Sequence, residues 1–409
     1  AHAVKIAMNK TNKTSTIYIL NGDYTTAPID VTEANITFIG QEKGKVIIHG
    51  NGKYIFDVYG ENLISKFENI DFVDSYSPSG NMGALRLYAD YSEFTVNNCN
   101  FRNISAKYGA IDLEGDKGTV NINNCIVEDV TASASNSAIV YIYADESNVN
   151  FDNVKITNCK LDEKYASENP TTYLRALFYV ASSSATVTLT NSRITDNYGA
   201  MYGGVIESKS KLTVENTVIS NNVVNTSANG NNGGEYLIWA SNDNSDISIS
   251  NCVITDNTIV KTTKGLLYNH KGNMKIEFSD LSNNNVEKFV GGTGTLTADN
   301  NWWGTNDQPD TKVNKWVVMN VALNDSDLKE NNKITLTIDF NHVKTASGDL
   351  EELTGGEIPK NSYSIDLSAK NGEINPTNVV VNKGQTVTKT FTVTEINDEI
   401  TLACANMCL

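Results

Sequence analysis

The sequence has little proline, arginine or histidine, with six, four and four residues among 409. No stretch repeats apolar residues at helical spacing, which argues against a mainly helical protein. No run of about 18 apolar residues is present, so we expect no membrane insertion. The histidines lie far apart and no paired Cys/His spacing is present, so we expect neither a metal site nor a cofactor.

Basic residues are also few, since 32 Lys and Arg stand against 48 Asp and Glu, for a net charge of −16. This charge repels phosphate backbones and anionic membranes, so nucleic acid is not an expected partner. No secretory signal heads the chain, because Ala1–Met8 is too short to be one, and we expect a mature or trimmed sequence. The six cysteines and several N-x-[ST] sequons are compatible with an extracellular location.

A repeat centred on one asparagine per copy is the main positive signal. Segments such as FTVNNCNFRN (94–103) and ISISNCVITD (247–256) align without gaps. Positions four and two before the asparagine and three after it are apolar in nearly every copy, and Asp or Asn stands five after it. The central residues are Asn69, Asn98, Asn124, Asn153, Asn191, Asn216 and Asn251, with Phe278 in the last copy.

Each copy has the pattern of one turn of a solenoid. Alternating apolar positions indicate a half-buried strand, and the change of phase at the asparagine indicates a turn. The later Asp or Asn suits a second turn, because these side chains tolerate left-handed backbone. A third apolar segment comes next, as in GALRLYA and SAIVYIYA. Three strands per period of 22 to 38 residues predict a single-stranded right-handed parallel β-helix.

Three of the four tryptophans lie close together after the last copy. Trp303 falls in an apolar column, so we expect it to cap the stack, with Trp302 and Trp316 packed against the next domain. An aromatic ligand platform is the alternative. We therefore predict a β-helix of about ten rungs over 1–309 and an immunoglobulin-like β-sandwich over 310–409, where alternating strands such as KITLTIDFN recur.

The segment TIYILNGDYT, the asparagine rungs, the closing NNWWGTN and the C-terminal module together resemble the adhesin-like surface proteins of methanogenic archaea. The resemblance covers almost the whole chain. It implies a secreted, cell-surface protein whose β-helix contacts other cells or glycans, and it implies no catalytic residue. The terminal ACANMCL departs from such proteins, which usually continue into further repeats or an anchor.

An enzyme is the competing class, because β-helices also carry polysaccharide lyases and hydrolases. Their chemistry needs convergent carboxylates, or an acidic calcium cluster with a base. The hydrolase-like signatures NTD, DD, GHG and RIK are absent, and no acidic cluster flanks Arg86, Arg102, Arg175 or Arg193. We therefore predict that the chain is not an enzyme.

The cysteines at the position after the asparagine share their column with small and apolar residues. We expect Cys99, Cys125 and Cys252 to be buried thiols. A disulfide between Cys99 and Cys125, which stand in adjacent rungs, and another between Cys404 and Cys408 are left open.

Two long periods gain their extra residues at the same place, between the Asp/Asn turn and the third strand. The insertions are 159–173 and 222–236, and same-side insertions of solenoids often form a binding face. Tyrosine, which suits sugars and protein surfaces, is frequent there. The candidate contact residues are Tyr76, Tyr108, Tyr165, Tyr173, Tyr198, Tyr202 and Tyr236. Packing of these rings against the loops is the alternative.

The sequence thus predicts a non-catalytic adhesin at the cell surface that contacts a glycan or protein of another cell. One alternative is a structural building block of the cell envelope, in contact with copies of itself. A polysaccharide lyase or hydrolase is the third.

Overall fold

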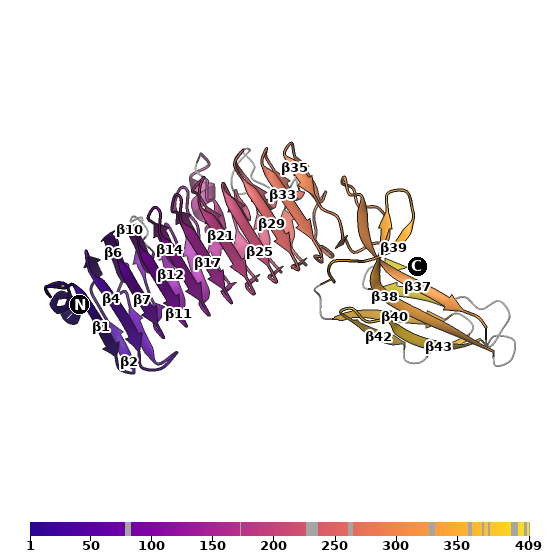
Figure 1. Ribbon diagram of the computed structural model, residues 1–409, viewed down its shortest axis with the longest axis horizontal. Helices are drawn as coiled ribbons and strands as arrows, with labels where there is room; N and C mark the ends of the chain where they lie inside the picture. The colour runs from indigo at the N-terminus through magenta and orange to yellow at the C-terminus, as the bar shows by residue number, and fades with distance from the viewer. Residues whose placement is uncertain are drawn as a thin grey trace. The chain divides into compact units, whose positions relative to one another are not determined.

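Two compact units make up the chain in the computed structural model (Figure 1). The first comprises Ala1–Ile249, Asp256–Lys275 and Asn284–Leu296, and the second Ser250–Thr255, Ile276–Asn283 and Thr297–Leu409. The structure describes residues 1–77, 83–171, 173–225, 236–260, 265–326, 332–358, 362–369, 372–374, 377–393, 400–404 and 407–408. Within these ranges no helix is long and apolar enough to cross a membrane.

Three parallel sheets, here called A, B and C, form the first unit, and successive turns of the chain add strands to the same sheets (Figure 1). Sheet A runs in the order β1 (Thr14–Ile19), β4 (Asn35–Gly40), β7 (Ile64–Glu68), β11 (Glu93–Asn97), β14 (Thr119–Asn123), β17 (Asn148–Asp152), β21 (Thr186–Thr190), β25 (Lys211–Glu215), β29 (Asp246–Ser250), β33 (Asn273–Glu277) and β35 (Thr295–Thr297).

Sheet B in this unit runs in the order β2 (Gly22–Thr25), β5 (Val46–His49), β8 (Asp71–Val73), β12 (Asn100–Ala106), β15 (Ile126–Ala132), β18 (Lys155–Thr157), β22 (Arg193–Thr195) and β26 (Val218–Ser220). Short strands extend its edge: β9 (Tyr76–Ser77), β19 (Lys160–Leu161), β23 (Tyr198–Gly199), β27 (Val223–Asn225) and β31 (Thr258–Val260).

Sheet C runs in the order β3 (Ile29–Thr32), β6 (Phe56–Glu61), β10 (Leu85–Asp90), β13 (Ile111–Glu114), β16 (Val140–Tyr143), β20 (Ala176–Val180), β24 (Gly204–Ser208), β28 (Tyr236–Ala240), β32 (Gly265–Asn269) and β34 (Val290–Gly292). Strands adjacent in these sheets are about one turn apart in the sequence and pair in parallel. The predicted parallel β-helix is therefore confirmed.

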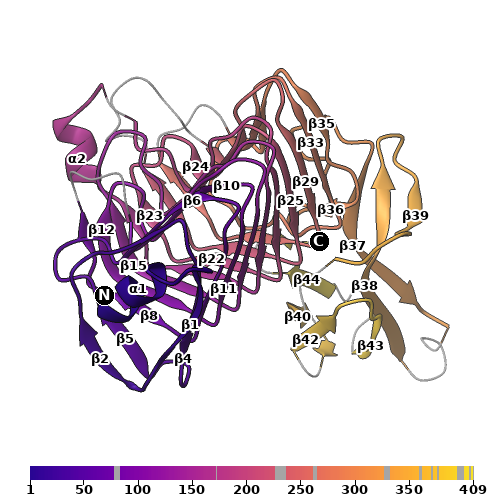
Figure 2. The ribbon, with the colours of Figure 1, turned by 60° about the vertical axis from the view of Figure 1, so that its left-hand side comes forward.

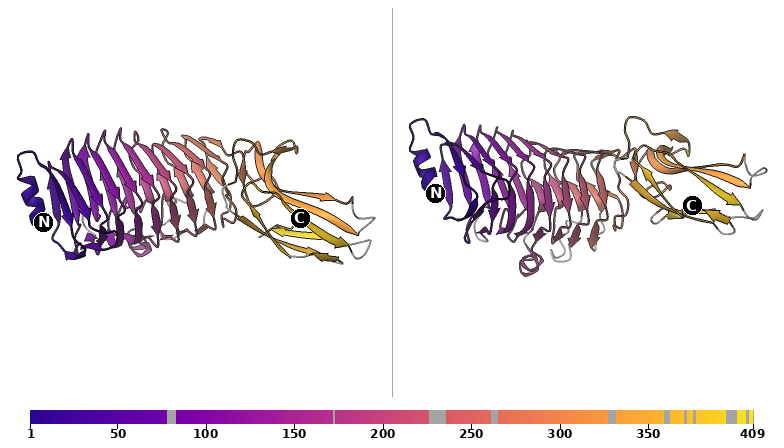
Figure 3. Two further views of the ribbon diagram at one scale, coloured as in Figure 1. Left: turned by 60° about the horizontal axis from the view of Figure 1, so that its bottom comes forward. Right: turned by 90° about the horizontal axis from the view of Figure 1, so that it is seen from below.

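Two short helices accompany the strands in the described residues of this unit (Figure 2). Helix α1 (His2–Met8) lies at the N-terminal end of the stack. Helix α2 (Glu163–Glu168) forms in the first insertion, because the carboxylate of Asp162 accepts hydrogen bonds from the backbone N–H of Lys164 and Tyr165. It stands out from the stacked strands (Figure 3).

The apolar columns of the repeat form the interior, as predicted. The residues two before and three after each central position are all buried, and phenylalanines of adjacent rungs stack there. The ring centroids of Phe38 and Phe67 are 4.9 Å apart, and those of Phe72 and Phe101 are 4.8 Å apart. This distance matches the spacing of neighbouring strands, about 4.8 Å, so the rungs are packed face to face.

The predicted turns are confirmed by the backbone. Every central residue of the repeat has a positive φ, from 50° at Asn216 to 57° at Asn69 among the seven asparagines, and 51° at Phe278. The Asp or Asn five residues later is also left-handed in all eight copies, from Asp74 to Asn283. Asn and Asp adopt this conformation at little steric cost, which explains why both columns hold these residues.

A ladder of buried asparagines runs through the interior of later rungs. Asn197 Nδ2 donates to Asn222 Oδ1 at 2.9 Å, and Asn222 Nδ2 donates to Asn257 Oδ1 at 2.9 Å. Each of these side chains also bonds backbone atoms, as in Asn222 Nδ2 to the Ile194 carbonyl at 2.9 Å. All three are at most 1% exposed. The ladder satisfies polar groups that water cannot reach.

The cysteines of the repeat are reduced. Cys99, Cys125 and Cys159 are free and buried, as is Cys252. The expectation of buried thiols is confirmed, and the open Cys99–Cys125 disulfide is absent from this described part of the chain. The side chains of Cys404 and Cys408 lie outside the described residues, so that pairing stays open.

His49 joins two carboxylates of neighbouring rungs at the surface of sheet B. Its Nε2 lies 2.6 Å from Asp23 Oδ1 and its Nδ1 lies 2.6 Å from Asp74 Oδ2. Burial alone would lower the pKa of His49, but the hydrogen bonds and charges of Asp74 and Asp23 raise it above the ordinary 6.5. Folding therefore favours the protonated ring.

This pair of contacts predicts a pH-dependent stability. The contribution of His49 is fully present below about pH 6.5 and is lost as the pH rises through the raised folded pKa. We expect His49→Gln to lower the melting temperature by roughly 1–2 °C more at about pH 5.5 than at about pH 8.5. Scanning calorimetry measures this difference. In a control chain that lacks the partner carboxylates, Asp23→Asn with Asp74→Asn, His49→Gln should no longer show this difference between the two pH values. An equal loss of melting temperature at both pH values in the parent chain contradicts the prediction.

The second unit contains two sheets with a shared core. One runs β36 (Asn301–Trp302), β37 (Lys315–Asn324), β38 (Lys333–Thr345), β43 (Val387–Val393) and β41 (Gly372–Ile374), with β39 (Leu350–Glu352) on β38. The other runs β42 (Asn378–Asn382), β40 (Ser362–Ala369), β44 (Ile400–Cys404) and β45 (Met407–Cys408). The strand β30 (Val253–Thr255) also belongs to this unit.

The core of the second unit joins both of its sheets, since Ile338 and Phe391 of one pack with Ile365 and Val381 of the other. This is the arrangement of a β-sandwich. The expected immunoglobulin-like character of the sandwich, and its boundary at residue 310, stay predictions.

The three clustered tryptophans are buried in the second unit, at 2%, 2% and 3% exposure for Trp302, Trp303 and Trp316. Trp302 packs in the sandwich core against Phe340, with ring centroids 5.1 Å apart. Trp316 Nε1 donates to the Asn306 carbonyl at 3.0 Å. Rings this deeply buried offer no platform to a ligand, while their role as a cap stays a prediction.

Candidate functional site

The outward side chains of sheet C form one continuous column along the first unit. Each strand contributes the residue that is in register with its neighbours, and the column is rich in charged and aromatic groups. Its members are Asp57, Arg86, Asp112, Tyr141, Tyr179, Glu207, Trp239 and Tyr268. Successive members are about 4.8 Å apart, the spacing of parallel strands.

The later part of this column surrounds one arginine. Arg175 Nη2 lies 3.0 Å from Glu207 Oε1 and donates to Tyr179 Oη at 3.0 Å. Its guanidinium carbon lies 5.0, 5.4 and 5.9 Å from the ring centroids of Tyr179, Tyr202 and Trp239. Such distances give favourable cation–π interactions. We call these five residues the arginine–aromatic cluster.

The cluster has a buried floor and a partly exposed rim. Glu207 and Tyr179 are buried, whereas Arg175, Tyr202 and Trp239 keep part of their surface. Burial raises the pKa of Glu207, and the charge of Arg175 opposes this rise. Burial would lower the pKa of Arg175, but Glu207 and Tyr179 raise it overall. The guanidinium therefore stays charged beside its carboxylate.

Two glycines let the chain turn above the cluster. A Cβ on Gly203 would lie 2.1 Å from Glu207 Oε2, so a larger residue there would force the carboxylate to move. Gly204 has φ +79°, and a Cβ there would lie 1.9 Å from the Tyr236 carbonyl. The sequence MYGG thus brings Tyr202 over the sheet.

Three of the predicted tyrosines gather around Trp239. Tyr173 and Tyr202 meet with ring centroids 4.4 Å apart, and Tyr202 lies 5.5 Å from Trp239. Tyr236 also packs on Trp239, at 5.5 Å, but is only 1% exposed and offers no surface to a ligand. Tyr173 and Tyr202 are therefore partly exposed, whereas Tyr236 is buried, and the contact role of these tyrosines stays a prediction.

The other four predicted tyrosines lie apart from Trp239. Tyr108 is 8% exposed and stacks on Tyr141, with centroids 4.0 Å apart. Tyr76 and Tyr198 are exposed on short strands of sheet B, and Tyr165 lies on α2. Of the second insertion, 226–235 lies outside the described residues.

The earlier part of the column is acidic. Asp57 accepts two hydrogen bonds from Arg86, both of 2.9 Å, and Arg86 Nη1 lies 3.9 Å from Glu114 Oε2. Asp112 is fully buried, and neither of its carboxylate oxygens has a hydrogen-bond partner. Three exposed tyrosines, Tyr59, Tyr88 and Tyr143, stand beside these groups on β6, β10 and β16. We call these seven residues the acidic patch.

Three of the arginines have acidic partners in the structure, although no acidic cluster flanks them in the sequence. Arg86 pairs with Asp57, Arg175 with Glu207, and Arg102 Nε lies 2.6 Å from Glu128 Oε1. In each case the partner comes from a neighbouring rung, 26 to 32 residues away in the sequence. Flanking residues do not reveal these partners, because the spatial neighbours of a residue in a solenoid come from adjacent rungs.

A signal for the missed residues is present in the third apolar segment of each copy. Arg86, Asp112, Tyr141 and Glu207 stand at one outward position of GALRLYA, GAIDLEG, SAIVYIYA and GGVIESK. The segments align with each other on that position. Their distance from the repeated asparagine varies with the insertions, however, and this variation hides the column in an alignment of whole copies.

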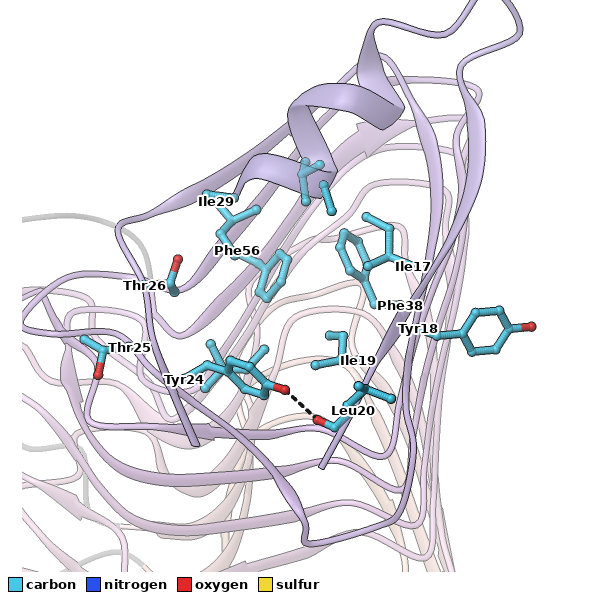
Figure 4. Close-up of a pocket in the computed structure, with 14 residues that line it drawn as sticks. Ile17, Tyr18, Ile19, Leu20, Tyr24, Thr25, Thr26, Ile29, Phe38 and Phe56 are labelled. Atoms are coloured by element: carbon cyan, nitrogen blue, oxygen red, sulfur yellow. Dashed lines mark hydrogen bonds between the residues drawn. The ribbon is translucent and has the colours of Figure 1, made fainter. Parts of the chain in front are cut away.

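A separate cavity of about 410 Å³ lies at the N-terminal end, beside α1 (Figure 4). Its wall includes Ile17, Ile29, Phe38 and Phe56, and none of its described lining residues has an acidic, basic, histidine or cysteine side chain. Tyr24 Oη donates to the Leu20 carbonyl at 2.8 Å. Because charged side chains are missing from this lining and gather on sheet C, we take sheet C as the candidate site. No group of His, Cys, Asp and Glu among the described residues is arranged to hold a metal ion.

Comparison with known proteins adds one finding. No protein-family model and no curated protein sequence matches the chain. A solved structure that matches is a mannuronic acid specific polysaccharide family 6 lyase from human gut microbiota, with a TM-score of 0.37 and 13% identity over 76% of this chain and 80% of that one. This neighbour is an enzyme, which contradicts the prediction that the chain is not one, and that prediction is withdrawn. At this identity the likeness concerns the fold.

Proposed function

We propose that the protein is an extracellular surface protein that binds a glycan at the arginine–aromatic cluster. The observation that carries the proposal is the partly exposed rim of Tyr173, Tyr202 and Trp239 around the Arg175 guanidinium. Sugars pack their C–H faces on such rings and direct their hydroxyls to nearby polar groups.

Unpaired polar atoms support the same assignment. Arg175 Nε and Trp239 Nε1 are buried donors without a hydrogen-bond partner. Such groups are rare in folded proteins, and each needs a water or a ligand to complete its bonding. Two donors beside a carboxylate match the alternating donor and acceptor character of sugar hydroxyls.

The location and the partner are part of the proposal. A net charge of −16 suits a solvated surface that is exposed to other cells. The resemblance to adhesin-like surface proteins supports a glycan of another cell as the partner.

The test is binding of the purified chain to a panel of soluble polysaccharides and to whole cells. We expect Tyr202→Ala to weaken glycan binding roughly tenfold, because it removes one aromatic face. The matched control is Tyr18→Ala, which removes a tyrosine that is 74% exposed on sheet A. The same incubations, assayed for reducing ends and unsaturated sugars, report whether the glycan is cleaved.

Two outcomes would overturn the proposal. Equal loss of binding in Tyr202→Ala and Tyr18→Ala would separate binding from this cluster. An absence of binding to every polysaccharide and cell would favour the alternative of a structural envelope protein, which ordered self-assembly of the pure chain would support. Circular dichroism of each variant checks the fold.

A further inference from the structure

The acidic patch lies on the same face as the arginine–aromatic cluster. Arg86 on β10 and Glu207 on β24 are four strands apart in sheet C. At about 4.8 Å per strand this is roughly 19 Å along the column. One extended polymer that lies along the sheet therefore reaches both groups.

The patch presents aromatic faces to solvent. Tyr59, Tyr88 and Tyr143 are 48%, 40% and 52% exposed. The rings of Tyr59 and Tyr88 lie 5.3 Å apart at 32°, and the Arg86 guanidinium is 5.3 Å from the Tyr88 ring. Exposed rings fixed on adjacent strands are costly to leave in water and are typical of a contact surface.

A hollow of about 100 Å³ opens beside the Tyr59 and Tyr88 rings. It is also lined by three carboxylates, those of Glu33, Glu61 and Asp90.

Three further carboxyl groups, those of Asp57, Asp112 and Glu114, stand on strands β6 and β13 of the same sheet. Two cations act on these three, Arg86 by direct contact with Asp57 and by its charge, and Lys107 through its charge on Asp112 and Glu114. Acidic groups therefore outnumber the cations around the exposed rings.

The buried Asp112 is the group that points to a ligand. Both of its oxygens lack hydrogen-bond partners, although it stands in register between Arg86 and Tyr141. Burial and the nearby charge of Glu114 raise the pKa of Asp112 well above its ordinary value. Burial also raises the pKa of Glu114. Ionised carboxylates are therefore unfavourable here without an additional cation, and an added anion is more unfavourable still.

We propose that the acidic patch is a second subsite of the glycan-binding face, and that it selects a chain of amino sugars over a chain of uronic acids. Protonated amines of the sugar supply the missing positive charge and the hydrogen-bond donors, while the tyrosine rings receive the sugar faces. The inference rests on the proposed function, because it assumes that sheet C binds a glycan.

The test compares oligomers of glucosamine, N-acetylglucosamine and mannuronic acid of equal length by titration calorimetry. We expect the glucosamine oligomer to bind about tenfold more tightly than its N-acetylated form, and the mannuronic acid oligomer to bind most weakly. Glu114→Gln should reduce the preference for free amines severalfold and lower its dependence on salt. It should weaken binding of the glucosamine oligomer severalfold more than binding of the N-acetylated oligomer, because only the free amines carry the charge that Glu114 attracts.

The matched control is Glu128→Gln, which also neutralises a glutamate beside an arginine, but on sheet B. It should leave all three affinities unchanged. Equal affinities for the two glucosamine forms, tighter binding of the mannuronic acid oligomer, or equal effects of Glu114→Gln and Glu128→Gln would each overturn the inference. The proposed function would survive those results; it fails if Tyr202→Ala weakens binding no more than Tyr18→Ala does, or if no polysaccharide or cell binds.

Discussion

Replacing Asn222 with alanine is expected to lower the free energy of unfolding by about 3–5 kcal/mol. The Asn222 side chain accepts hydrogen bonds from the backbone N–H and the side chain of Asn197, at 3.2 and 2.9 Å. It donates to the Ile194 carbonyl and to Asn257, both at 2.9 Å. Alanine removes this partner from four buried groups, and each unmet group costs about 1–3 kcal/mol. Asn257 Oδ1 still accepts a hydrogen bond from the backbone N–H of residue 222 in the variant. The expected cost for each of the four groups is therefore near the lower limit of about 1 kcal/mol.

The matched control is Asn150→Ala. Asn150 belongs to a similar ladder, between Asn121 at 3.0 Å and Thr188 at 2.9 Å, but on the outer face of sheet A, where water replaces the lost bonds. We expect a loss of about 1 kcal/mol or less there. Calorimetry of both variants measures the difference, and equal losses would show that the interior ladder stabilises the fold no more than the outer one does.

Arg175→Ala is expected to destabilise the first unit by about 3–5 kcal/mol, because it leaves the Glu207 carboxylate buried without its cation. The Glu207 side chain is fully buried and that of Arg175 is 14% exposed, so solvent does little to screen the remaining charge. The double variant Arg175→Met with Glu207→Gln should recover most of the loss, since it removes both charges and keeps the volume. Denaturant unfolding of the two variants beside the parent chain measures both effects.

The same Arg175→Ala variant should show a pH dependence of defined sign. Burial already raises the pKa of Glu207, and removing Arg175 takes away the charge that opposes the rise. The folded variant then binds a proton that the unfolded chain has released, so its stability falls as the pH rises from the ordinary value of 4.5 through the folded value. A penalty that is the same at about pH 5 and about pH 8 would contradict this account.

The rungs could be predicted from sequence because the signal of each is local. A position such as Phe67 must be apolar in every copy to face the interior, and Asn69 must tolerate left-handed backbone. Both constraints act within about ten residues, so they survive as columns of the repeat. The stacking partner of each residue then follows from the repeat.

The site could be predicted only in part, because its interactions join different rungs. Tyrosine enrichment pointed to Tyr173 and Tyr202 as candidates. The groups around them in the structure, Arg175, Glu207 and Trp239, come from three strands or their flanks. Nothing within one rung requires glutamate at position 207. The glutamate is explained by its ion pair with Arg175 of the preceding rung. That contact depends on the register of strands that are separated by insertions of variable length.

Stacking by whole rungs gives the face of sheet C the property of a ruler. Each rung carries one outward residue of the column, so the acidic patch and the arginine–aromatic cluster are separated by a whole number of strand spacings, here four between Arg86 and Glu207. The stretch Asn124–Asp152 is one complete rung of this ruler, because Asn124 and Asn153 are equivalent positions 29 residues apart.

Inserting a second copy of Asn124–Asp152 would move the two groups apart by one strand spacing, about 4.8 Å, without changing the contacts inside either group. The distance between them is thus adjustable in fixed steps, while the chemistry of each is set separately. Gain or loss of whole rungs would therefore reset the distance between the two groups in steps of about 4.8 Å.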